Sequence, residues 1–186
     1  MNTGFAYQEE ARDELINGQI VLMSPSPAAN HVIVVGNIYA IFHAYLKGKQ
    51  CTPFMDGLDV YLTEKDRFEP DMMVVCDPQK IKYNGVHGAP DLVVEVLSPS
   101  TAKRDRSYKK QVYEQCGVRE YWLVNIADRS IEQYLLADGQ LQLAEVYALP
   151  GDYLTEAERA PYITELKCSL YDDLRVSLED VFYRVK

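Results

Sequence analysis

Two carboxylates lie at positions of the chain where a charged side chain is costly. Asp71 opens the apolar run 72–76 directly after Pro70, and Glu95 lies inside the apolar run 91–97. An unpaired charge among buried apolar side chains costs several kcal/mol, so a compensating cation is expected beside Glu95. Consecutive strands are neighbours in roughly two-thirds of cases. If these two runs are neighbouring strands, both carboxylates can face one cleft.

Two interpretations of this carboxylate pair are open. In the first, two carboxylates ~4 Å apart repel each other by about 4 kcal/mol at an effective dielectric of about 20, so that one takes up a proton or a divalent cation binds between them. Oxygen ligands without His or Cys favour Mg²⁺, Mn²⁺ or Ca²⁺ over zinc. In the second, Asp71 caps a turn and Glu95 pairs with an arginine or a lysine. Asp91 competes with Asp71, because it also follows a proline and shares a strand face with Glu95.

The basic segment that follows Glu95 can supply the cation. Five of the eight residues 103–110 are basic in a chain whose net charge is −9. Residues three or four apart share a helix face, so Lys109 shares one with Val112 and Tyr113, which we expect to face the sheet. Lys109 is therefore predicted beside the two carboxylates. A solvated basic face and contact with phosphate both stay open for the remaining basic residues at the start of this helix: Lys103, Arg104 and Arg106.

The elements that position these residues are predicted from hydrophobic periodicity and from Gly and Pro. They form one α/β (α+β) domain over residues 1–186, in which a central mixed β-sheet is flanked by helices. Strands are predicted at residues 19–23, 58–63, 71–76, 91–97, 120–126, 130–136 and 140–147. Helices are predicted at residues 7–16, 28–47, 103–116 and 177–184.

The composition limits the class of protein. No apolar run approaches the roughly 20 residues that span a bilayer, and the acidic first residues lack the apolar core of a secretory signal. We therefore expect a cytoplasmic protein with no membrane partner. The four cysteines have no CxxC spacing, which indicates reduced, packed thiols and neither a zinc nor a dithiol site. The net charge of −9 opposes general affinity for nucleic acid but leaves a local basic patch open.

The order of these motifs resembles the PD-(D/E)XK nuclease superfamily and, within it, the Uma2-like family of restriction-endonuclease-type proteins defined as a domain of unknown function. The runs Gly88-Ala-Pro-Asp-Leu-Val-Val-Glu-Val-Leu-Ser-Pro-Ser-Thr101 and Gly117-Val-Arg-Glu-Tyr-Trp-Leu-Val124 are specific, whereas Pro70-Asp71 alone is weak. The other matching positions lie between about residues 10 and 136 and include residues 14–20, residues 23–25, His31, Asp105, Lys109 and Tyr113.

The resemblance implies a restriction-endonuclease-like core in which Asp71 and Glu95 bind Mg²⁺ (or Mn²⁺) and Lys109 is the catalytic lysine. The superfamily usually places this lysine two residues after the glutamate, where this chain has Leu97. The resemblance implies that the following helix supplies it instead, which Lys109 fits. Three further residues are candidates for the border of the site: His31 and Glu14, which match family positions, and Asp91.

The implied activity is metal-assisted hydrolysis of phosphodiester bonds in DNA, with duplex DNA as the partner and a homodimer as the assembly. Two other functions stay open. A non-catalytic binding or interaction protein that keeps the nuclease fold agrees with the net charge of −9. A glycosidase with a carboxylate pair is disfavoured by the single Trp122, since sugar-binding clefts commonly display aromatic side chains.

Overall fold

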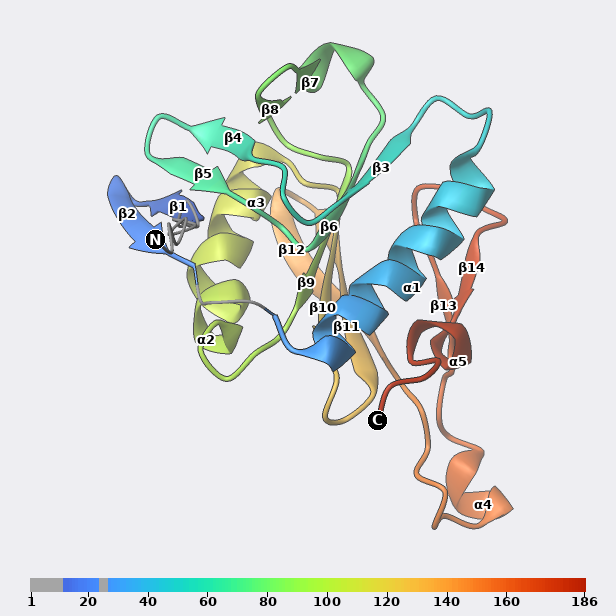
Figure 1. Cartoon of the computed structure of the whole chain (residues 1–186). Coiled ribbons are helices and arrows are strands. Elements are labelled where there is room, and N and C mark those ends of the chain that lie inside the picture. Colours follow the sequence, from blue (N-terminus) through green and yellow to red (C-terminus); the bar gives the residue numbers. More distant parts are fainter. Residues whose placement is uncertain (1–11, 24–26) are drawn as a thin grey trace, which may run out of the picture.

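A six-stranded mixed sheet, the central sheet, forms the middle of the protein in a computed structural model that describes residues 12–23 and 27–186 (Figure 1). Within this sheet β9 and β10 pair in parallel, and all other neighbouring strands of the sheet are antiparallel. This arrangement confirms the predicted mixed central sheet. The strands, in their order across the sheet, are β12 (Gln140–Ala148), β11 (Ser130–Ala137), β10 (Glu120–Asn125), β9 (Leu92–Val96), β6 (Met72–Val75) and β3 (Thr52–Met55).

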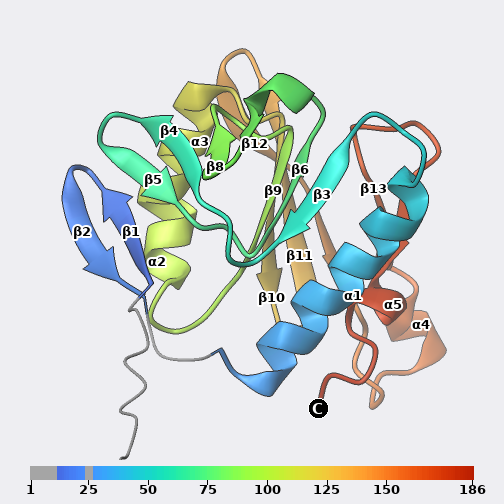
Figure 2. The same cartoon turned by 45° about the horizontal axis from the view of Figure 1, so that its top comes forward.

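A second six-stranded sheet and one long helical segment cover one face of the central sheet (Figures 1 and 2). The helical segment runs without a break from residue 102 to residue 116, and its middle turn is a π-turn. Its parts are α2 (Ala102–Arg104), η2 (Asp105–Lys109) and α3 (Lys110–Cys116). The second sheet has the order β2 (Gln19–Leu22), β1 (Asp13–Ile16), β5 (Asp66–Phe68), β4 (Val60–Thr63), β8 (Gly85–His87) and β7 (Ile81–Lys82), and the short η1 (Pro78–Lys80) precedes β7.

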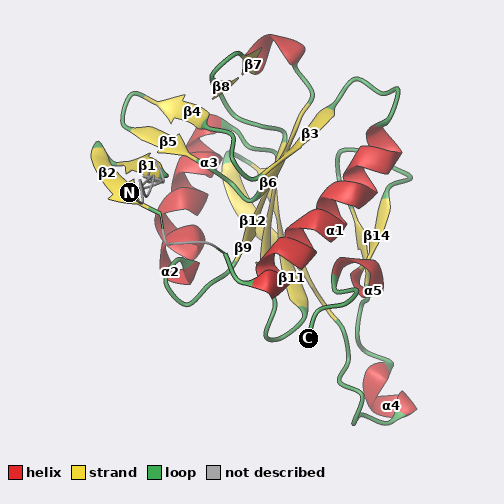
Figure 3. Cartoon of the chain, in the orientation of Figure 1, coloured by secondary structure: helices red, strands yellow, loops and turns green. Residues whose placement is uncertain are grey.

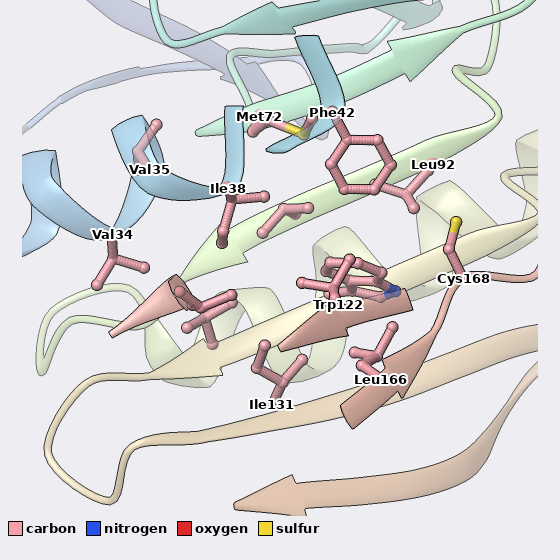
Figure 4. Close-up of a cluster of buried hydrophobic side chains, with 14 of the residues drawn as sticks. Val34, Val35, Ile38, Phe42, Met72, Leu92, Trp122, Ile131, Leu166 and Cys168 are labelled. Carbon is pink, nitrogen blue, oxygen red and sulfur yellow. The ribbon is translucent and has the colours of Figure 1, made fainter. Parts of the chain in front are cut away.

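Helix α1 (Ala29–Leu46) covers the opposite face of the central sheet (Figure 3). Val34, Ile38 and Phe42 face the central sheet in one core cluster, in which Phe42 packs against Trp122 of β10 (Figure 4). Among the helices of the described ranges, α1 alone has the length and apolar composition to cross a membrane. Its apolar face is instead part of the core. The same side holds β13 (Glu165–Lys167), β14 (Arg175–Ser177) and α5 (Leu178–Val181), while α4 (Glu156–Arg159) stands away from the body.

Strand β9 has the two faces that its alternating side chains predict. Val94 and Val96 pack in the core cluster under α1. Val93 packs in the cluster under α3, and Glu95 points to the same side. Met72 of β6 pairs with Val94, so one more step along this antiparallel register brings Asp71 opposite Glu95.

The predicted helix over residues 7–16 is wrong for residues 13–16, which form β1, and residues 7–11 lie outside the described part of the chain. Strand β1 forms a hairpin with β2, and the predicted strand over 19–23 is confirmed. The turn is Asn17-Gly18, with φ values of 50° and 76°. Two successive positive φ angles are the requirement of a tight hairpin turn, which Asn-Gly meets best. The helical spacing of the flanking residues was therefore misleading.

The expectation of four reduced cysteines is also wrong, because Cys51 and Cys76 form a disulfide bond. Thr52 of β3 pairs with Val75 of β6, so the next residue on each side of this antiparallel pair is a cysteine. Strand pairing thus brings together two thiols that lie 25 residues apart in the sequence. Cys116 and Cys168 are free. The expected cytoplasmic location stays a prediction.

Reduction of this disulfide is expected to lower the free energy of unfolding by about 3 kcal/mol, because a closed loop of this length restricts the unfolded chain by roughly that amount. Thermal unfolding with and without dithiothreitol measures the change. The matched control is the double variant Cys51→Ala/Cys76→Ala, in which dithiothreitol should have no effect. A wild-type transition that does not respond to the reductant would contradict the prediction.

Candidate active site

A cleft of about 920 Å³ opens between the β1–β2 hairpin, the first turn of α1 and the start of the 102–116 helical segment. Figures 1 and 2 both show the hairpin beside this segment. Four acidic side chains and one lysine lie together in the cleft: Glu14, Asp71, Glu95, Asp105 and Lys109. The family resemblance predicts Glu14 only at the border of the site, and the local sequence pattern predicts a helix where β1 lies.

Lys109 is the centre of the cluster. Its Nζ lies 2.7 Å from Glu14 Oε1, 3.0 Å from Glu95 Oε1 and 3.9 Å from Asp105 Oδ1. The Tyr113 hydroxyl donates a second hydrogen bond to Glu95 Oε1, at 2.9 Å. Lys109, Glu14, Glu95 and Asp105 are all buried. The structure therefore places the lysine beside Glu95, where the helical spacing puts it.

The carboxylates outnumber the cation in this cluster. Burial raises the pKa of Glu95 well above its ordinary value, and the charges of Asp105, Asp71 and Glu14 raise it further against the opposing charge of Lys109. Burial alone would lower the pKa of Lys109, but Glu95, Glu14 and Asp105 outweigh it and raise that pKa, so the ammonium stays charged. An added positive charge would relieve the excess of carboxylates.

Asp71 directly precedes β6 and joins the cluster from there. Its Oδ2 accepts a hydrogen bond from the backbone N–H of Val96 at 2.6 Å, which ties it to the strand of Glu95. Its Oδ1 lies 3.0 Å from Nε2 of His31, in the first turn of α1. The two candidate metal ligands and His31 therefore line the same cleft.

The sequence model of the Uma2 family, described as "Putative restriction endonuclease", matches residues 5–166. The chain belongs to the Uma2 family. It is 30% identical to Uncharacterized protein slr1290 of Synechocystis sp. over 129 residues, which are 68% of this chain and 67% of that protein. It is 27% identical to Uncharacterized protein sll1609 of the same organism over 144 residues, 75% of this chain and 81% of that one.

A crystal structure described as a putative nuclease belonging to DUF820, from Anabaena variabilis, has the same fold. The two chains superpose with a TM-score of 0.67 at 19% sequence identity, covering 94% of this chain and 91% of the other. The resemblance to this family and the restriction-endonuclease-like fold are therefore confirmed. Membership of the Uma2 family supports a nuclease.

Asp71 and Glu95 offer carboxylate oxygens as ligands for a cation. Both hydrogen bonds to Glu95 end on Oε1, which leaves Oε2 for a cation. Within residues 12–23 and 27–186 there is no group of three or more His, Cys, Asp or Glu side chains that could hold an ion. Magnesium is commonly held by one or two carboxylates and keeps several waters, whereas zinc requires three or four protein ligands. Asp71 and Glu95 supply carboxylate oxygens of the kind that Mg²⁺ prefers.

Two of the candidate residues lie elsewhere. Asp91 does not line the cleft: it is at the other end of β9, where its Oδ2 accepts a hydrogen bond from the backbone N–H of Cys76 at 2.7 Å. Lys103 is exposed and also outside the lining. Arg104 and Arg106 do line the cleft, although Arg106 is 2.6 Å from Glu132.

The roles of two acids were missed. Glu14 was expected only at the border, but it makes the shortest contact to Lys109, and its Oε1 also accepts a hydrogen bond from the backbone N–H of Glu69 at 3.1 Å. Asp105 was assigned no role. It precedes Lys109 by four residues, as Lys109 precedes Tyr113, so the helical spacing that selected Lys109 could have selected Asp105 as well.

The His31–Asp71 pair predicts a pH dependence of stability. Burial lowers the pKa of His31, but the hydrogen bond to Asp71 and the charges of Asp71 and Asp56 outweigh it, so the pKa is raised above 6.5. Because the folded-state pKa is the higher one, the pair stabilises the fold fully below the unfolded pKa. The contribution, up to about 1 kcal/mol, is lost as the pH rises through the folded-state pKa.

Urea unfolding of the wild type and of His31→Gln from acidic to alkaline pH measures this contribution. The difference in unfolding free energy between the two proteins should shrink as the pH rises past the raised pKa. The variant His43→Gln, on the exposed side of α1, is the matched control and should follow the wild type. A difference for His31→Gln that grows with pH would contradict the assigned charge state.

Proposed function

We propose that this Uma2 protein is a Mg²⁺-dependent endonuclease that hydrolyses phosphodiester bonds in DNA. The observation that supports it most is the buried contact of Lys109 with Glu95, 3.0 Å long, in a cleft that Asp71 also lines. Family membership supports the nuclease class, and the identity of the metal, the nucleic acid and the catalytic residues is our proposal.

The residues of the proposed site have different tasks. Asp71 and Glu95 hold the ion, which when bound supplies a Lewis acid and lowers the pKa of a coordinated water. Lys109 orients the attacking water or offsets the negative charge that grows on the phosphate. The raised pKa of Lys109 suits the second task, because it keeps the ammonium charged. His31 orients Asp71 through the 3.0 Å contact.

Basic side chains line the cleft beside the acidic ones, and we propose that they contact the DNA backbone. Arg104 and Arg106 line the cleft from the helical segment, and Arg129 and Lys186 line it from elsewhere. Arg104 NH1 is 3.9 Å from Glu14 Oε2, and its Nε has no hydrogen-bond partner within the described part of the chain. We propose that these side chains supply the local positive charge that a chain of net charge −9 needs in order to bind phosphate.

We propose duplex DNA as the substrate and a homodimer as the active form, because two symmetric sites can cut both strands. Sizing with light scattering gives the oligomeric state. A dimer that cuts both strands in one encounter converts supercoiled plasmid directly to the linear form, whereas a monomer accumulates nicked circles first. A monomeric mass together with nicking would contradict the homodimer and leave the nuclease assignment in place.

Plasmid cleavage tests the proposed function. Purified protein is incubated with supercoiled plasmid and Mg²⁺ or Mn²⁺, with EDTA as the control and with labelled RNA as a second substrate. Cleavage of DNA that stops with EDTA is expected. Failure to cut any substrate, together with no heat of Mg²⁺ or Mn²⁺ binding in calorimetry, would favour a non-catalytic protein that keeps the nuclease fold.

A further inference from the structure

Asp105 is a buried acid that has no hydrogen-bond partner on one oxygen. The residue is 1% exposed, and within the described ranges its Oδ1 accepts no hydrogen bond. Native proteins leave few buried polar atoms unsatisfied, because an unpaired buried group is costly. Asp105 nevertheless lines the cleft beside the proposed catalytic lysine. We therefore ask what function the unpaired Oδ1 of Asp105 has.

The backbone holds Asp105 in place at the first residue of the π-turn Asp105–Lys109. The Tyr121 hydroxyl donates a hydrogen bond to the backbone carbonyl of Asp105 at 3.1 Å, from the central sheet below. Single π-turns inside helices are frequent at functional sites. Oδ1 of Asp105 lies 3.9 Å from Nζ of Lys109, just beyond hydrogen-bond distance.

Lys109 contacts a carboxylate that a divalent cation would also use. Its Nζ is 3.0 Å from Glu95 Oε1, and Glu95 is a proposed metal ligand. A cation on Glu95 repels the ammonium and draws the same carboxylate charge to itself. Glu14, at 2.7 Å, is not a proposed metal ligand and can keep its contact with Lys109. Asp105 Oδ1, 3.9 Å from Nζ, is an acceptor that a small movement of Nζ would reach.

We propose that Asp105 is a positioning residue that receives Lys109 when a divalent cation binds Glu95. Nζ of Lys109 keeps its contact with Glu14, leaves Glu95 Oε1 and moves to Asp105 Oδ1. No group changes its charge. The unsatisfied Oδ1 of Asp105 is thus the acceptor that Lys109 takes when the cation is bound. The inference rests on the proposed function, since it requires a cation at Asp71 and Glu95.

The ammonium signal of Lys109 reports this exchange directly. In protein labelled with ¹⁵N-lysine, the signal of this buried ammonium is identified by its loss in Lys109→Arg. Addition of Mg²⁺ should shift it in the wild type. The shift should disappear in Asp105→Ala, which has no acceptor, and should be intermediate in Asp105→Asn, which keeps an uncharged one. If Asp105 had a purely structural role, the shift would not decrease from the wild type through Asp105→Asn to Asp105→Ala.

Calorimetry on the same proteins separates the exchange of Lys109 from the proposed metal site at Asp71 and Glu95. Mg²⁺ should bind Asp105→Ala about tenfold more weakly than the wild type, because Lys109 then stays on Glu95. Asp138→Ala, in the exposed turn after β11, is the matched control and should bind as the wild type does. Measured Mg²⁺ binding with a Lys109 signal that stays fixed, or that moves equally in all three proteins, would overturn the exchange and leave the metal site standing. Absence of Mg²⁺ binding by the wild type would instead overturn the metal site itself.

Discussion

Glu95→Gln is expected to lower DNA cleavage by about 10³-fold while the fold stays intact. Glutamine keeps the shape of the side chain and can still accept from Tyr113 and Lys109, which both contact Oε1. It cannot supply the negative charge that a bound cation requires, and electrostatic groups of this kind are worth roughly 10²–10³ in rate. Burial raises the pKa of Glu95, which means that the charged carboxylate lowers the free energy of unfolding.

Initial rates on plasmid and a melting curve of each protein test this expectation. Glu179→Gln, an exposed glutamate on α5, is the matched control and should cut at the wild-type rate. The melting temperature of Glu95→Gln should equal or exceed that of the wild type. Equal cleavage by Glu95→Gln and the wild type would remove Glu95 from the active site.

Glu120→Ala is expected to lower the free energy of unfolding by about 3–5 kcal/mol, because it leaves several buried donors without an acceptor. Glu120 is 0% exposed. Its Oε1 accepts hydrogen bonds from Trp122 Nε1 and Gln133 Nε2, both at 2.6 Å. Its Oε2 accepts from the backbone N–H of Ser169 at 2.7 Å, which ties the segment after β13 to the central sheet.

Urea unfolding of Glu120→Ala and Glu120→Gln measures the loss. Glutamine can still accept from Trp122, so Glu120→Gln should be the less destabilised of the two. Trp122 belongs to the core cluster under α1, on the other face of the sheet from Glu95. Folded protein of either variant should therefore keep its Mg²⁺ affinity. A stability loss below about 1 kcal/mol for Glu120→Ala would contradict the role given to this carboxylate.

This role explains part of the Gly117–Val124 run that carries the family resemblance. Glu120 and Trp122 lie on the same side of β10, two residues apart, so their side chains can meet. The acid of this specific motif is thus a structural acceptor for the C-terminal part of the chain. The candidate active site lies on the opposite face, where Tyr121 contacts Asp105.

The sequence by itself determined the local parts of the site. Alternation along residues 91–97 places Glu95 opposite the face of Val94, because side chains on a strand have a period of two. The spacing of three and four along residues 103–116 turns Lys109 toward the sheet with Tyr113, because that is the period of a helix. Both rules act within one element, and both agree with the structure.

Only the tertiary structure decided which distant residues meet. Glu14 reaches Lys109 because a hairpin, and not the predicted helix, carries it over the helical segment. Cys51 meets Cys76 because the register of β3 on β6 continues beyond the strand ends. Asp91 shares the face of Glu95 but lies at the far end of the strand, away from the cleft. Pairing and register depend on contacts between segments far apart in the chain, which no local period encodes.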